Sequence, residues 1–150
     1  MKLLINSIII ILLLMNFACK STYPSSEVNY IDNVGKDILI VAAKGYGNNQ
    51  RVAMNDAEKR AFKTLFFKGI PNSSYRFGMM PNKETEKQYF LQAFFDTQKH
   101  REFIVASNIT SPISRNQQKK AKELVLEVQI NTLSLRKYLE HQDVVHKFGF

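Results

Sequence analysis

Cysteine, tryptophan and acidic residues are scarce in this chain of 150 residues. It has one cysteine and no tryptophan, and 13 Asp and Glu stand against 21 Lys and Arg, for a formal charge of +8. One cysteine excludes an internal disulfide and any zinc site built on several thiolates. No internal repeat or low-complexity run is present. Hydrophobic residues make up 45% and charged residues 23%, which is typical of one globular domain.

The first eighteen residues form a separate segment. Lys2 is followed by an almost wholly apolar stretch, 3–15, and the chain turns polar again at Lys20. This stretch would be roughly 20 Å long as a helix. That length is typical of the core of a signal peptide and is too short for a membrane span, which needs about 20 apolar residues.

Cys19, the only cysteine, lies just after this stretch. Its setting resembles the lipobox of bacterial lipoproteins, with Asn16 and Phe17 where that family usually has Leu and a small residue. The resemblance implies that residues 1–18 are a signal peptide and that acyl chains on Cys19 anchor the protein durably in a membrane. The residue after the cysteine is Lys20 rather than Asp, which implies that the protein is sorted to the outer membrane. Which leaflet it faces is left open. The alternatives are an uncleaved anchor or an ordinary signal peptide.

The mature chain divides into a tether and a domain. Residues 21–35 hold Pro24, three serines and two asparagines without a sustained period, which favours an irregular segment. We therefore expect a lipidated tether over 19–36 and a single domain over 37–150.

The domain is predicted to contain strands and helices in the order β-α-α-β-β-α. A strand over 37–44 ends at Gly45-Tyr46-Gly47, a tight turn that would need positive φ. The pair Asn48-Asn49 offers a cap for a helix over about 50–68, which Gly69 ends. Alanines at every fourth position let this helix lie close on a sheet. The same signals predict a helix over 84–97, with Tyr89, Phe90, Ala93 and Phe94 on one side. They also predict a strand over 101–110 stopped by Ser111-Pro112, an alternating strand over 122–130, and a helix over 132–140. Helices packed on one face of a small antiparallel sheet make this a two-layer α+β fold.

Two stretches carry a second resemblance, which covers roughly residues 37–140. They are AAKGYGNNQRVAMNDAEKRAFKTLFFKG and KELVLEVQINTLSLRKYLE. Their pattern resembles small domains of flagellar accessory lipoproteins and related outer-membrane lipoproteins. The resemblance implies a structural or adaptor module of an envelope assembly.

No arrangement of residues indicates catalysis, so we expect no enzyme, cofactor or metal. Gln50 stands where a dinucleotide-binding loop would have its third glycine. His100, His141 and His146 have no Asp, Glu or Cys spaced to complete a metal site, and we expect them at the surface or at helix ends. No serine lies in a nucleophile-elbow motif.

The basic and aromatic residues suggest partners instead. A positive surface attracts polyanions, and for an envelope protein these would be anionic head groups, lipopolysaccharide phosphates or an acidic partner, rather than nucleic acid. The alternative is a solvated face with no partner. The residues proposed for an apolar partner-binding surface, as opposed to the core, come from two places. Tyr75, Phe77, Met79 and Met80 lie in a predicted loop over 71–83 that holds two prolines and a glycine, and the adjacent rings of Phe94 and Phe95 must point in two directions. The sequence thus favours a non-enzymatic lipid-anchored adaptor, with a binding module for a hydrophobic or anionic small ligand as the alternative.

Overall fold

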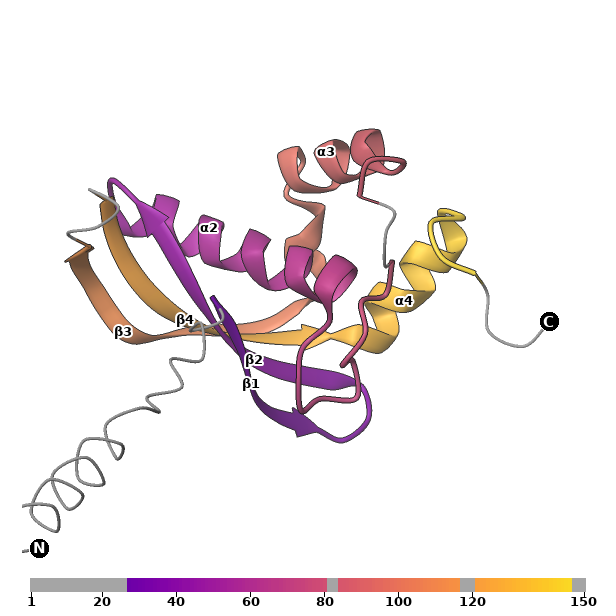
Figure 1. Cartoon of the computed structure of the whole chain (residues 1–150), viewed down its shortest axis with the longest axis horizontal. Coiled ribbons are helices and arrows are strands. Elements are labelled where there is room, and N and C mark those ends of the chain that lie inside the picture. Colours follow the sequence, from indigo (N-terminus) through magenta and orange to yellow (C-terminus); the bar gives the residue numbers. More distant parts are fainter. Residues whose placement is uncertain (1–26, 81–83, 117–120, 147–150) are drawn as a thin grey trace, which may run out of the picture.

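The computed structural model describes residues 27–80, 84–116 and 121–146. Cys19, the predicted signal peptide and residues 19–26 of the predicted tether lie outside these ranges. The described chain forms a four-stranded antiparallel sheet in the order β1-β2-β4-β3, with its helices on one side (Figure 1). The predicted α+β class is confirmed. The strands are β1 (Val28–Val34), β2 (Ile38–Gly47), β3 (Ile104–Asn116) and β4 (Ala121–Asn131), and the helical elements are α2 (Gln50–Lys63), the π-helical turn η2 (Thr64–Lys68), α3 (Gln88–Asp96), the 3-10 turn η3 (Lys99–Phe103) and α4 (Thr132–His141).

Residues 28–34, which the sequence places in the tether, form the edge strand β1. It pairs antiparallel with β2, and Gly35, with φ of 64°, lies in the turn between them. The register shifts between Tyr30 and Asp32, so the strand lacks the regular alternation that would have marked it. The domain therefore includes residues before 37, and the observed order is β-β-α-α-β-β-α.

The helix α2 lies very close to β2 because both surfaces are built from small residues. Ala53, Ala57 and Ala61 are fully buried. Gly45 and Gly47 do not have positive φ, so the prediction that the turn requires glycine for this reason is wrong. A Cβ atom on Gly45 would instead lie 1.9 Å from the carbonyl oxygen of Ala53. The close approach of the helix is what requires glycine here.

Both predicted ends of the long helix are confirmed. The side chain of Asn49 accepts a hydrogen bond from the Val52 N–H at 3.0 Å, which satisfies a free donor of the first turn. At the other end, Gly69 follows η2 with φ of 77°, a conformation that favours glycine.

The strand β4 alternates as predicted, but β3 differs from its prediction. β3 begins at Ile104, and residues 101–103 belong to η3. It then continues through Pro112 instead of stopping there. An edge strand tolerates proline because one row of its backbone groups has no partner strand, and the register is irregular between Ser111 and Ser114. The buried residues of β4 are Leu124, Leu126, Val128 and Ile130.

The helix α3 is shorter than predicted and buries a different side. Leu91 and Phe94 are buried, whereas Tyr89 is 89% exposed and Ala93 is also exposed. Only Phe94 and the half-buried Phe90 of the expected side face the core. Phe94 lies among rings from several elements, with centroid distances of 5.6–6.1 Å to Phe62, Phe66, Tyr138 and Phe103.

Candidate functional site

Three of the six predicted partner-binding residues belong to the core. Met80 is 1% exposed, Phe94 is 2% exposed and Phe95 is 6% exposed. They cannot form a contact surface in this fold, so that part of the prediction is corrected. The doubled Phe94-Phe95 pair can be buried as a whole because both α2 and η3 cover α3: Phe95 lies 5.5 Å from the ring of His100 and Phe94 lies 6.0 Å from that of Phe62.

The other three predicted residues, Tyr75, Phe77 and Met79, lie together in an open groove of about 730 Å³. Tyr75 and Met79 are half-buried, while Phe77 is 72% exposed. The loop that carries them is fixed to the end of the long helix, because the Met79 N–H donates to the Leu65 carbonyl at 3.0 Å. The hairpin between β1 and β2 and the helix α4 supply the other walls of the groove through Asn33, Gly35, Lys36 and Arg136.

The groove is positively charged. Lys36, Arg76 and Arg136 line it, and no acidic residue is among its described lining residues. The Arg76 guanidinium lies 5.1 Å from the centroid of the Phe77 ring, which places a cation and an aromatic face side by side. Arg136 also pairs with Glu140 at 2.8 Å. We call this surface, lined by Lys36, Tyr75, Arg76, Phe77, Met79 and Arg136, the cationic groove.

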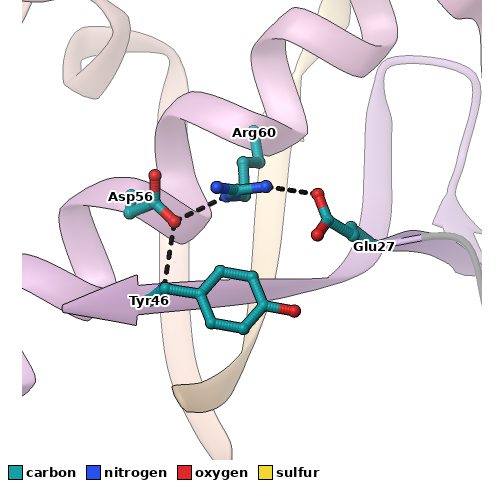
Figure 2. Close-up of polar contacts among 4 residues, drawn as sticks. All are labelled: Glu27, Tyr46, Asp56 and Arg60. Atoms are coloured by element: carbon teal, nitrogen blue, oxygen red, sulfur yellow. Dashed lines mark hydrogen bonds and ion pairs between the residues drawn. The ribbon is translucent and has the colours of Figure 1, made fainter. Parts of the chain in front are cut away.

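A second polar cluster, shown in Figure 2, ties β1 and β2 to α2. The Arg60 Nε donates to Asp56 Oδ2 at 2.5 Å, and the same guanidinium pairs with Glu27. Asp56 Oδ2 also accepts from the backbone N–H of Tyr46 at 2.9 Å. Burial would lower the pKa of Arg60, but Asp56 and Glu27 outweigh it and raise the pKa. The ion pairs of this cluster therefore hold Glu27, just before β1, against the helix.

The third cluster is buried and corrects the prediction of a surface or helix-end position for His100. This ring is fully buried, and its Nε2 lies 3.5 Å from Glu58 Oε2, too far for a good hydrogen bond. Arg101 Nε donates to the same Glu58 oxygen at 2.9 Å. Burial would raise the pKa of Glu58, but the contacts with His100 and Arg101 outweigh it and lower the pKa.

Glu58 and His100 join α2 to η3. Neither residue lines the cationic groove or the groove beside Glu27. His100 packs 5.7 Å from the ring of Phe62. The sequence held one signal for this cluster, because Glu58 precedes the core residue Phe62 by one helical turn and so lies on the same flank of the helix.

The described residues offer no grouping of three or more His, Cys, Asp or Glu side chains that could hold a metal ion. No helix within the described ranges is long and apolar enough to cross a membrane. The predicted lipidation site, Cys19, lies outside these ranges. Comparisons of the chain with protein-family models, with curated proteins and with solved structures found no match.

Proposed function

We propose that this chain is a non-enzymatic envelope lipoprotein, anchored through acyl chains on Cys19, whose domain acts as an adaptor. In this proposal the cationic groove binds an acidic segment of a partner protein. The observation that carries the proposal is the composition of that groove: three cations and three large apolar side chains, without an acidic residue among its described lining.

The chemistry of the groove fits a peptide segment that carries both charge and an apolar side chain. Arg and Tyr are enriched at the energetically important positions of protein interfaces. Phe77 is 72% exposed, so binding would remove a large apolar surface from water. Lys36 and Arg76 make no ion pair with another described residue. An acidic partner would therefore form ion pairs with Lys36 and Arg76 without breaking an existing one.

The shape of the groove favours a protein partner over a small ligand. Sites for small molecules commonly enclose 70–90% of the ligand surface. The cationic groove has one wall from a loop, one from a hairpin and one from α4, and it is open to solvent between them. A segment of a larger partner can lie across such a surface and be held by contacts on both sides of it.

The anchor is tested through the predicted acylation site. Replacing Cys19 with Ala should abolish metabolic labelling of the protein by fatty acid and leave the larger, unprocessed chain. The measurement is labelling with an alkyne fatty acid, followed by electrophoresis. Retention of the label in the Cys19→Ala variant would contradict the lipid anchor.

The groove is tested by photo-crosslinking in living cells, with a photoreactive phenylalanine at position 77. The matched control carries the same group at Tyr89, an aromatic position on α3 that is even more exposed. We expect one discrete protein adduct from position 77, which position 89 does not give and which Arg76→Glu removes. Identical adducts from both positions, or no protein adduct from position 77, would overturn the adaptor proposal.

A further inference from the structure

The outward face of α2 and η2 carries a row of cations. Arg51, Lys63 and Lys68 are exposed, and Lys59 is half-exposed. At about 100° per residue, the three on α2 fall within an arc of about 120°, which near the end of the helix also contains the buried Phe62. None of the four forms an ion pair with another described residue. We call Arg51, Lys59, Lys63 and Lys68 the basic strip.

The acidic residues of the same helix do not neutralise this strip. Asp56 is engaged by Arg60 and by the backbone of Tyr46. Glu58 is 5% exposed and is paired with Arg101. Apart from Arg60, the cations of α2 are therefore left without an ion pair to another described residue, and Lys63 Nζ lies 5.8 Å from the centroid of the Phe95 ring on α3. Both carboxylates of the helix are held in contacts with the rest of the domain.

One end of the strip lies beside Glu27, the first residue that the structure describes. Lys63 and Lys68 line a groove of about 470 Å³ together with Glu27, and Glu27 is held there by its ion pair with Arg60 (Figure 2). Glu27 follows Cys19 by eight residues. Even a fully extended chain of eight residues spans no more than about 28 Å. The cations are thus near the point at which the proposed anchor holds the domain.

We propose that the basic strip rests on the anionic head groups of the membrane that holds the acyl chains of Cys19. This inference rests on the proposed lipid anchor and adds the orientation of the domain, with α2 toward the bilayer. Basic side chains are attracted to an anionic membrane surface only within about a Debye length, roughly 8 Å at physiological salt. The short tether keeps the strip close to the surface and so makes this weak attraction effective.

An apolar side chain on the same face supports this orientation. Val52 is 46% exposed and falls, by the same angular count, between Lys59 and Lys63. A helix that lies in the head-group region commonly combines basic residues with apolar side chains that reach the acyl boundary. The acidic Glu84, which shares the groove with Lys63 and Lys68, faces this surface as well and is outnumbered by the cations of the strip.

The test uses the full acylated protein in vesicles and a fluorophore on a single introduced cysteine. In the acylated protein the Cys19 sulfur is consumed by its lipid, so Lys63→Cys and the control Ser111→Cys, an exposed position on β3, each offer one free thiol. Nitroxide groups on the lipid heads then quench a fluorophore that lies near the membrane. With about 30% phosphatidylglycerol in phosphatidylcholine, we expect at least twofold stronger quenching at position 63 than at position 111. In pure phosphatidylcholine, or in about 0.5 M salt, the difference should disappear.

A charge-reversal variant tests the cations themselves. Lys59→Glu with Lys63→Glu and Lys68→Glu should lower quenching of a fluorophore at Arg51→Cys to the level of the control position. The matched variant changes the same net charge at three exposed cations elsewhere: Arg115→Glu, Lys122→Glu and Lys137→Glu. It should leave the quenching unchanged. Equal effects of the two variants would show a response to net charge alone and would overturn the proposal.

Failure of the anchor and failure of the orientation give different results. If the protein without an introduced cysteine takes up the thiol reagent, or does not float with either kind of vesicle, the lipid anchor is wrong and this inference is wrong with it. If the protein floats with the vesicles but position 63 is quenched no more than position 111, the anchor stands and the basic strip does not face the membrane.

Discussion

Replacing Gly45 with alanine should force α2 away from the sheet. The added Cβ would lie 1.9 Å from the carbonyl oxygen of Ala53 and 2.7 Å from both the backbone nitrogen and the Cβ of Ala57. An ordinary van der Waals contact begins near 3.4 Å, so the helix must retreat by about 1.5 Å. The atoms in the way are mostly backbone, and they cannot turn aside as a flexible side chain would.

The energetic cost follows from the contacts that this retreat loosens. A gap of 0.5–1 Å already forfeits about a quarter to a half of the dispersion energy between packed atoms. Ala53, Ala57 and Ala61 are all fully buried against the sheet and would lose contact together. Overpacking usually costs about 1–3 kcal/mol. We expect Gly45→Ala to exceed that range, at about 3–4 kcal/mol of unfolding free energy, which is roughly 10–15 °C in Tm for a domain of this size.

Thermal and urea unfolding, followed by far-UV circular dichroism, measure this cost. The matched control is Gly35→Ala, because no atom lies within 4 Å of the added Cβ there and the only penalty is its φ of +64°. Backbone strain of that kind costs about 1–2 kcal/mol. A Gly45→Ala variant as stable as Gly35→Ala would refute the argument that helix proximity is the reason for glycine at position 45.

Three further predictions concern stability. Glu58→Gln should lower the free energy of unfolding by about 1–3 kcal/mol at neutral pH. The fold lowers the pKa of Glu58 from its ordinary value of 4.5. The carboxylate therefore stabilises the fold fully above pH 4.5, and this stabilisation is lost as the pH falls through the lowered pKa of the folded state. Urea unfolding midpoints of the wild type and the variant, measured from neutral to acidic pH, test this, and a difference in stability that does not change with pH would contradict it. Phe94→Ala should cost about 3–5 kcal/mol, whereas Phe77→Ala, at an exposed position, should stay within about 0.5 kcal/mol; equal shifts in melting temperature would place both rings in the core. Asn49→Ala should cost about 1 kcal/mol through loss of the helix cap, and an unchanged unfolding free energy would show that the cap bond is not stabilising.

The candidate groove was partly predictable from the sequence. Tyr75, Phe77 and Met79 were suggested by their apolar character within a loop that contains proline and glycine, and the structure brings them into one groove. Phe94 was assigned to the same surface because two adjacent aromatic residues on one helix point in different directions. The sequence could not show that α2 and η3 cover both of those directions. Lys36 and Arg136 are 100 residues apart in the chain, and only tertiary structure brings them to the same groove.

Local signals determined the elements that depend on neighbours along the chain. The alternation of β4, the helix cap at Asn49 and the helix end at Gly69 each rest on interactions within a few residues, so the sequence alone was sufficient for them. The tertiary structure decided what depends on a partner far away in the chain. β1 is a strand because it pairs with the edge of β2, and β3 continues through Pro112 because no strand within the described ranges pairs on its outer side. His100 is buried because Glu58 and the rings of α2 and α3 surround it. The residues next to His100 in the sequence show no hydrophobic pattern that would have predicted this burial.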